Sequence, residues 1–558
     1  MNVSESENLK LAKKSDNVTP RWVFVLAMVL LAGHVWLVQR QVSELSPVGP
    51  EIGHMVRGSE ALLGNRDGLG RHPHPYDYVV GMQLLNAPDG AHRPVSPDSQ
   101  MPIAAQLDHV VKAWVHTGLF NASDSPLFAA RYTTLLMSIV LAILLFAMSR
   151  KMWGDHGGLL TLAMYCYSPA ILAHAPLATP DLANALILTA LAAWTWRKGI
   201  RLGKSGSPPP IWPLMLLVLV GVMQWAMASK PQPTELWASS WYLNGQVFDS
   251  HPGSFYRYTF LIKTPLATLV LLLLAQVVWI LSKGQRQRDI QLSWPMLCII
   301  VCTMYTASRV TEPTGWRLLL PMYPALFVLT GSLMRPPRKE SAKQQRWIPI
   351  AQKFSLLCVT VLVMQTVLFP QQFLTFTNQA ARQHDAIFPH LAVDNLDWGQ
   401  DVHIAVKQSD YVAGFGAVAE ADPSLGGKSL LQWSDKTLHG GRFAISSNYL
   451  SGATPKVLPR DWTPQMDQEY RRLREYFKSG LLKMPKSAGH HAHGMEALSH
   501  EQWMWLRLRL ARICAHLRVR QPDQVINKTM LVYDLSDEQV QFMLDTPPFA
   551  EDSEQLDW

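Results

Sequence analysis

Apolar residues recur along the first two thirds of the chain in stretches long enough to form membrane-spanning helices. Short polar segments separate nine such stretches, at residues 21–39, 126–149, 157–173, 181–196, 211–229, 259–282, 292–308, 315–334 and 350–370. Most approach the roughly 20 residues that a helix needs to cross a bilayer, and the third and fourth are shorter. The pattern predicts a mainly α-helical polytopic membrane protein with about nine spans, forming a transmembrane domain at 21–370.

Basic residues in the loops assign an orientation to these spans. Lys and Arg concentrate in the N-terminal tail 1–20 and in alternate short loops, whereas the intervening loops carry few. Because positively charged loops stay on the cytoplasmic side, we expect a cytoplasmic tail at 1–20. The loops 40–125 and 230–258 and the segment 371–558 then lie outside, which in a bacterium is the periplasmic side of the inner membrane. The first stretch is too long and too rich in Trp for a signal peptide, so it is expected to remain as an anchor.

The composition changes after Pro370, where the long apolar stretches end. Short alternating runs predict strands at 402–406, 443–446 and 530–533, and helical patterns cover 464–483 and 500–518. We therefore expect a small soluble α+β domain at 371–558. Its single cysteine, Cys514, excludes a disulfide within it.

Composition and charge fit this division. The chain has 558 residues, of which 48% are hydrophobic and 16% charged, with a formal net charge of +8. A basic excess is also typical of nucleic-acid binding, but here it lies in the loops assigned to the cytoplasm, where it sets topology and contacts anionic lipid. No nucleic-acid partner is expected.

Charged residues lie at similar depth near the outer ends of four predicted spans. They are Arg131, Asp181, Lys263 and Arg317. Charges at membrane depth are costly and are usually kept for function, and clustered cations there suit the phosphate of a lipid carrier. The alternative is that the long cations extend to the interface and that Asp181 caps a helix. For Arg317 alone the two interpretations carry equal weight.

The first external loop supplies candidate acid–base groups. Glu51 and His54 follow the first span closely, and His72 and His74 come later in the same loop. A carboxylate beside an imidazole can take a proton from an acceptor hydroxyl, although a Glu at a helix start is more often a partner of the helix dipole. The same groups, with Asp181, also have the chemistry to ligate a divalent metal, so a metal cofactor remains an open question.

A series of motifs resembles polytopic glycosyltransferases of the GT-C class. The matching segments are Pro50-Glu51-Ile52-Gly53-His54, His72-Pro73-His74-Pro75, the run 168–174 leading to Thr179-Pro180-Asp181, Tyr242-Leu243-Asn244-Gly245, Tyr256 through Lys263-Thr264-Pro265, and 315–324. Beyond the last span, 395–401 reads Asn-Leu-Asp-Trp-Gly-Gln-Asp, and 443–446 and 532–535 follow in order. In these motifs the chain is similar to bacterial relatives of the protein O-mannosyltransferases and lipid A aminoarabinose transferases (glycosyltransferase family 39).

The resemblance implies transfer of a sugar, with inversion, from a polyprenyl-phosphate carrier to a protein or glycolipid acceptor outside the cytoplasmic membrane. It implies an acidic base in the first loop and cations that face the carrier phosphate. Residues and resemblance together predict Glu51, His54 and Asp181 as catalytic. The predicted substrate-binding set is Arg131, Lys263, Arg317, His72, His74 and Tyr256.

One position departs from the family pattern, because Pro50 stands where the family has its first loop Asp. Proline cannot titrate and so cannot act as a base. The alternative is therefore a non-catalytic protein that binds lipid-linked glycan or scaffolds an envelope complex. A transporter is less favoured, because the membrane-depth charges lie near one face rather than at the midplane. For Asp397 and Trp398, a turn that docks the outer domain on the helices is favoured over a catalytic part.

Overall fold

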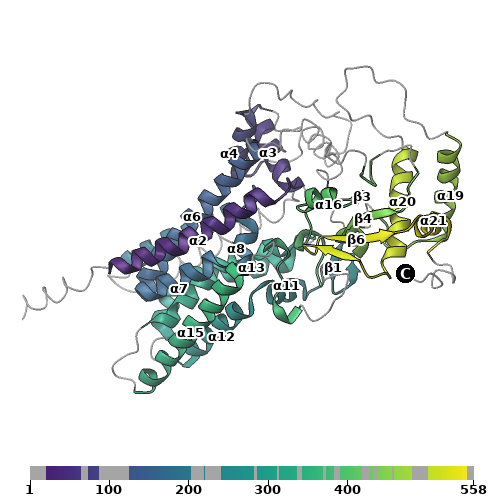
Figure 1. Cartoon of the computed structure of the whole chain (residues 1–558). Helices are drawn as coiled ribbons and strands as arrows, with labels where there is room; N and C mark the ends of the chain where they lie inside the picture. The colour runs from purple at the N-terminus through teal and green to yellow at the C-terminus, as the bar shows by residue number, and fades with distance from the viewer. Residues whose placement is uncertain are drawn as a thin grey trace, which may run out of the picture.

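The structure is a computed structural model that is mostly helical, with two small sheets. It describes residues 20–64, 73–86, 125–202, 219, 221, 240–281, 286–310, 313–335, 342–368, 373–381, 390–416, 428–432, 437–454, 458–480 and 500–548. Residues 1–19 of the predicted tail 1–20, most of the predicted span 211–229, and His72 lie outside the described residues. Figure 1 shows long helices gathered at one end of the molecule and a sheet with its own helices at the other.

Helices of the first part form a bundle around one apolar core. They are α2 (Arg21–Glu44), α6 (Pro126–Trp153), α7 (Asp155–Cys166), α8 (Pro169–His174), α9 (Asp181–Leu202), α11 (Phe255–Lys263), α12 (Leu266–Leu281), α13 (Arg286–Arg309), α14 (Met322–Thr330) and α15 (Ala342–Leu368). Helix α6 packs on α7 and α9, α2 packs on α7, and α12 packs on α15. Many large apolar side chains of α2 and α15 face outward, as expected for surfaces that contact lipid.

Among the described residues, three helical segments are long and apolar enough to cross a membrane: Arg21–Glu44, Pro126–Trp153 and Trp347–Leu368. A fourth is possible if α11 and α12, which meet at 110°, form one broken span. The remaining predicted stretches that the structure describes are also largely helical, but they are shorter, interrupted or flanked by charge. A membrane-associated helical protein is thus supported, and the count of nine spans stays a prediction.

The break between α11 and α12 has a local cause. Pro265 has no amide hydrogen to continue the helix, and its ring disfavours helical geometry before it. The carbonyl groups released at the break are taken up by Asn378, whose side chain donates to the oxygens of Leu261 (2.6 Å) and Thr264 (3.0 Å). The bend therefore holds Lys263, the last residue of α11, at a fixed place in the bundle.

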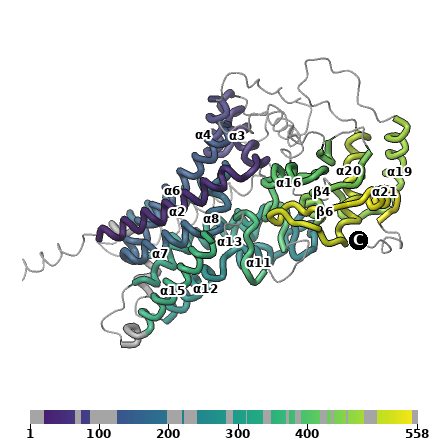
Figure 2. Tube along the Cα trace, in the orientation of Figure 1, coloured from purple at the N-terminus to yellow at the C-terminus, as the bar shows by residue number. Residues whose placement is uncertain are grey.

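Two short helices of the predicted external loop 40–125, α3 (Gly49–Leu62) and α4 (Pro75–Leu85), pack closely at the end of α6 (Figure 2). Their backbones touch at two glycines. A Cβ atom at Gly58 would lie 1.7 Å from the Asp77 carbonyl oxygen, and one at Gly81 would lie 2.4 Å from the Gly58 carbonyl carbon. This close approach places the polar side chains of α3 against those of α4.

The predicted outer domain contains a four-stranded mixed sheet in the order β3–β4–β6–β5. The strands are β3 (Tyr411–Ala413), β4 (Gly441–Ser446), β5 (Gln524–Ile526) and β6 (Met530–Leu535), with β3 parallel to β4 and the other pairs antiparallel. The associated helices are α16 (Val402–Gln408), α18 (Ser447–Ser451), α19 (Pro464–Lys478), α20 (His500–Leu517) and α21 (Asp537–Asp545). A hairpin of β1 (Trp241–Leu243) and β2 (Gln246–Phe248) adds Tyr242 to the core of this region.

The predicted strand at 402–406 is wrong, because this segment is the helix α16. Val402 and Ala405, three residues apart, are both buried in a cluster with Val412 of β3. That spacing places both residues on one face of a helix. The apolar run is too short for its pattern to distinguish a helix from a strand, so the tertiary contacts determine which one forms. The predicted strands at 443–446 and 530–533 and the predicted helices 464–483 and 500–518 correspond to β4, β6, α19 and α20.

Candidate functional site

Glu51 and Arg131 form a buried ion pair at the end of the bundle that is predicted to face outward. The Glu51 side chain is wholly buried and that of Arg131 is 1% exposed, with an Nη2–Oε2 distance of 2.7 Å. Arg131 Nε donates to Oε1 of the same carboxylate at 2.9 Å. Its other donors reach the carbonyl oxygens of Val42, Leu45 and Ser46. All five guanidinium N–H groups thus have protein acceptors, and Arg131 ties α6 to the end of α2 and to α3.

Glu51 accepts further bonds from two backbone amides. Val48 N donates to Oε2 at 3.2 Å and Ala178 N to Oε1 at 2.8 Å. A carboxylate with both oxygens engaged in this way is poorly placed to take a proton from a substrate. The contact with Ala178 instead connects α3 to the segment that leads into Asp181.

Asp181 begins α9 and lies beside an imidazole. Its Oδ2 accepts from the Thr179 hydroxyl at 2.8 Å and is 3.5 Å from Nδ1 of the buried His174. The His174 ring meets two indoles edge-on, with centroids 5.2 Å from Trp316 and 5.9 Å from Trp398. About 10% of the Asp181 side chain remains exposed, whereas that of Glu51 is fully enclosed. Asp181 is therefore the more accessible of the two predicted catalytic carboxylates.

Lys263 is a buried lysine whose hydrogen-bond partners are neutral carbonyl groups. Its residue is 2% exposed, and Nζ donates to the carbonyl oxygens of Leu374 (2.8 Å) and Asn395 (2.5 Å). The ammonium also lies 5.9 Å from the ring centroid of Trp316. In the part of the chain that the structure describes, no carboxylate lies within ion-pair distance of Lys263. Burial without a counter-ion disfavours the charged form of this amine, so an anionic ligand would be needed to stabilise an ammonium here.

Arg317 lies in the short 3-10 helix η3 (Trp316–Leu319) and pairs with Asp394 of η7 (Val393–Asn395) at 2.9 Å. Its guanidinium carbon is 5.4 Å from the ring centroid of Trp398. Trp398 also borders His174, and Trp316 borders both His174 and Lys263. The two indoles thus connect the groups around Asp181 with the two cations.

The segment 395–401 contacts both the helical bundle and the predicted outer domain, as expected for a docking turn at Asp397 and Trp398. The Asn395 side chain accepts from Trp316 N at 2.8 Å, and Gln400 O accepts from Ser46 N at 3.0 Å. Asp397 faces the sheet, where the Ser446 hydroxyl donates to it. The heptapeptide therefore joins the ends of several helices to β4.

His54 and Asp77 form a second buried pair, between α3 and α4. His54 Nδ1 lies 2.7 Å from Asp77 Oδ1, and both side chains are at most 2% exposed. Burial alone would raise the pKa of Asp77, but the charges of His54 and Arg57 outweigh it and hold the pKa below its usual value. His54 Nε2 has no hydrogen-bond partner among the described residues. The Asp77 carboxylate thus orients the imidazole, and the second ring nitrogen is left able to exchange a proton.

Two other predicted substrate-binding residues have structural partners. The Tyr256 hydroxyl donates to the Thr314 carbonyl at 2.8 Å and so supports the segment before Arg317. His74 caps α4, with Nδ1 accepting from Tyr76 N at 3.0 Å. Within the described residues, no three His, Cys, Asp or Glu side chains come together as a metal site.

The predicted carboxylates Glu51 and Asp181, together with Asp77, lie near one residue, Tyr76. Burial raises the pKa of the Tyr76 phenol, a hydrogen bond with Thr134 offsets part of that rise, and three nearby carboxylates add to it, those of Glu51, Asp77 and Asp181. Lys263 and Arg317 reach the same region through the two indoles. We call these residues the outer charge cluster: Glu51, His54, Asp77, Arg131, His174, Asp181, Lys263, Arg317 and Asp394.

Three members of the outer charge cluster escaped the sequence prediction: Asp77, His174 and Asp394. Asp77 closely follows the predicted His74, and His174 stands inside the motif that ends at Asp181. A carboxylate or imidazole near a predicted site residue was therefore an available signal for these two. Asp394 lies 77 residues from Arg317 along the chain. No feature of the sequence indicates that these two residues pair.

Asp397 makes the stability of the outer domain depend on pH. Burial raises its pKa to about 7 from a usual 3.8, against the opposing bonds from Ser446 and Gly399. The folded protein then holds a proton that the unfolded chain has lost, so this group's contribution falls as pH rises from about 4 to about 7. We expect Asp397→Asn, which cannot ionise, to gain stability relative to wild type across that window.

Thermal unfolding of both proteins at pH 4.5, 6 and 8 measures this difference. A difference between variant and wild type that stays constant with pH would show that Asp397 is ionised in the folded protein.

No protein-family model, no curated protein and no solved structure matches this chain.

Proposed function

We propose that the protein transfers a sugar from a polyprenyl-phosphate carrier to an acceptor at the outer face of the bacterial inner membrane, with inversion. The observation that carries this proposal is Lys263, a lysine buried beside Trp316 with neutral hydrogen-bond partners. A lipid phosphate entering at that level would supply the missing negative charge. The ordered motifs that resemble GT-C glycosyltransferases, and the apolar helices of the bundle, support the same assignment.

The proposed chemistry balances with the groups present. The acceptor hydroxyl oxygen forms a bond to the anomeric carbon of the sugar, while the bond from that carbon to the phosphate oxygen breaks. Polyprenyl phosphate leaves with an added negative charge, which Lys263 and Arg317 stabilise more strongly than they do the donor. Asp181 takes the proton from the hydroxyl, and His174 orients its carboxylate.

Glu51 and Arg131 have a different role in this proposal from the one that the sequence predicts. Both are saturated with protein partners, so they position the segment before Asp181 rather than contact substrate. Pro50, the departure from the family pattern, then removes no base, because the base lies on α9. His54, held by Asp77, remains available as a second proton carrier.

Binding of the carrier by Lys263 tests the proposal. Lys263→Met keeps the apolar stem but removes the charge, so affinity for polyprenyl phosphate should fall by about 10- to 100-fold, the effect of one charge-assisted bond. Affinity for polyprenol, which lacks the phosphate, should not change. Tail-fluorescent lipids and protein in detergent give both affinities. Equal binding of polyprenyl phosphate by wild type and variant would contradict the phosphate assignment.

The non-catalytic alternative is favoured by two observations, the complete engagement of Glu51 and the presence of Pro50 where the family has its first loop Asp. It predicts that reconstituted protein binds polyprenyl-phosphate hexose and never releases free polyprenyl phosphate. The enzyme predicts release that requires an acceptor, and it predicts no use of a sugar nucleotide. Mass spectrometry of the lipids after incubation distinguishes the two.

A further inference from the structure

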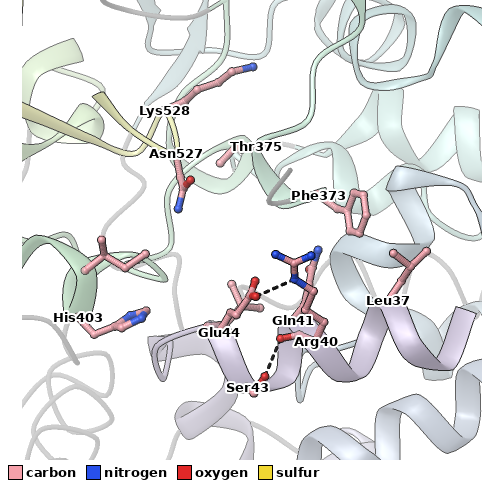
Figure 3. A pocket seen from close by; sticks show the side chains of 12 residues that line it. Leu37, Arg40, Gln41, Ser43, Glu44, Phe373, Thr375, His403, Asn527 and Lys528 are labelled. Atoms are coloured by element: carbon pink, nitrogen blue, oxygen red, sulfur yellow. Dashed lines mark hydrogen bonds and ion pairs between the residues drawn. The ribbon is translucent and has the colours of Figure 1, made fainter. Parts of the chain in front are cut away.

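A separate pocket of about 540 Å³ lies between the end of α2 and the outer domain (Figure 3). Arg40 and Glu44 of α2 face it from one side, and His403 of α16 and Asn527 of the β5–β6 turn face it from the other. None of its lining residues belongs to the outer charge cluster. The pocket is therefore separate from the outer charge cluster.

The α2 side of the pocket presents two opposite charges side by side. Arg40 Nε donates to Glu44 Oε1 at 2.8 Å, and the two side chains are 45% and 52% exposed. No described residue accepts a hydrogen bond from the terminal nitrogens of Arg40. A ligand with one negative and one positive group can satisfy both residues, whereas a simple anion would be repelled by Glu44 and a simple cation by Arg40.

The opposite wall is shaped by a strained turn. Asn527 and Lys528 both have positive φ, 48° and 66°, and Thr529 N donates to Ile526 O at 3.0 Å. Two such residues make a type I′ turn, which usually needs glycine or asparagine. Asp401 holds the turn by accepting from the Asn527 amide at 2.8 Å and from the Thr529 hydroxyl at 2.6 Å. Retained strain of this kind clusters at ligand sites.

The position of the pocket points to a membrane lipid. Leu37 and Phe373 form an apolar side next to the polar one. Trp36, one turn before Arg40, is 52% exposed on the outer surface of α2, where aromatic side chains mark the edge of the bilayer. A head group would thus meet the charges while its glycerol end meets the apolar side.

We propose that this pocket binds the phosphoethanolamine head group of a phospholipid, with the phosphodiester on Arg40 and the ammonium on Glu44. This inference is independent of sugar transfer. It needs only that α2 crosses the membrane and ends at the lipid head groups.

Native mass spectrometry of the full chain in detergent tests the proposal, with added phosphatidylethanolamine, phosphatidylglycerol or soluble phosphoethanolamine. Wild type should bind phosphatidylethanolamine about tenfold more tightly than phosphatidylglycerol, since only the former supplies the ammonium. Arg40→Gln should weaken binding of both lipids. Glu44→Gln should weaken phosphatidylethanolamine alone, so that the two lipids bind alike.

Gln39→Ala is the matched control, because Gln39 is an exposed neighbour on α2 that does not line the pocket. It should bind both lipids as wild type does. Arg40 and Glu44 are about half exposed, so their substitution leaves the core intact. Three outcomes overturn the proposal: tighter binding of phosphatidylglycerol by wild type, unchanged binding in both charge variants, or displacement of lipid by soluble phosphoethanolamine at equal concentration.

Discussion

Arg131→Ala is expected to lower the free energy of unfolding by about 3–5 kcal/mol, the usual cost of leaving a buried charge without its partner. The substitution leaves Glu51 fully enclosed with only two backbone amides, and it removes the donors of three carbonyl groups at the end of α2. Thermal unfolding of the detergent-solubilised protein measures the loss. Arg131→Lys should recover little, because one ammonium cannot reach acceptors on both sides.

Arg150→Ala is the matched control for this prediction. Arg150 lies on the same helix, α6, and pairs with Asp155, but their side chains are 31% and 28% exposed. A partly exposed pair of this kind contributes at most about 1 kcal/mol. A double change of Glu51→Gln with Arg131→Met removes both charges and should cost less than the two single changes together. Equal losses of stability in Arg131→Ala and Arg150→Ala would show that the Glu51–Arg131 pair does not stabilise the fold as a buried ion pair should.

Asp181→Asn is expected to reduce sugar transfer by about 10²- to 10⁴-fold, the contribution of a positioned general base. Its folding should barely change, because the amide oxygen can still accept the Thr179 hydroxyl that now bonds Oδ2. Carrier binding should also persist, since Lys263 is untouched. Transfer assays with reconstituted protein, alongside the affinity for polyprenyl phosphate, separate these effects.

Asp155→Asn provides the control for Asp181→Asn. Both carboxylates are the first residue of a helix, α7 and α9 respectively, so each substitution removes a similar interaction with the helix dipole, worth about 0.3–1 kcal/mol. Asp155→Asn also removes the partly exposed ion pair with Arg150. Only Asp181 belongs to the outer charge cluster. If Asp181→Asn transfers sugar at the wild-type rate, another group takes the proton, and His54 becomes the next candidate to substitute.

Much of the helical part could be predicted from the sequence because apolar length is a local property. The helices α2, α6 and α15 coincide with predicted stretches, since an uninterrupted apolar run contains the whole signal. Interruptions were harder to place. Pro265 signals a break, but the 110° bend also depends on Asn378, which approaches from more than a hundred residues away and satisfies the released carbonyls.

The candidate site could be predicted only as a set of charges at one level. The sequence identifies Glu51, Arg131 and Asp181 by residue type and depth. It cannot show which hydrogen-bond and ion-pair partners each of them has. Glu51 is saturated by Arg131 and two amides, which moves the proposed base to Asp181. Because such saturation arises from contacts across the fold, position along the chain contains no signal for it.

Everything proposed for the outer charge cluster depends on its position on the outer side of the membrane. The five native cysteines are buried, so a single introduced cysteine reports its own position. Val519, 80% exposed in the outer domain, and Lys151, exposed at the opposite end of α6, are suitable sites.

We predict that a membrane-impermeant maleimide labels Val519→Cys on intact cells and labels Lys151→Cys only after the membrane is opened. Labelling in the reverse order would place the charge cluster in the cytoplasm and contradict sugar transfer at the outer face.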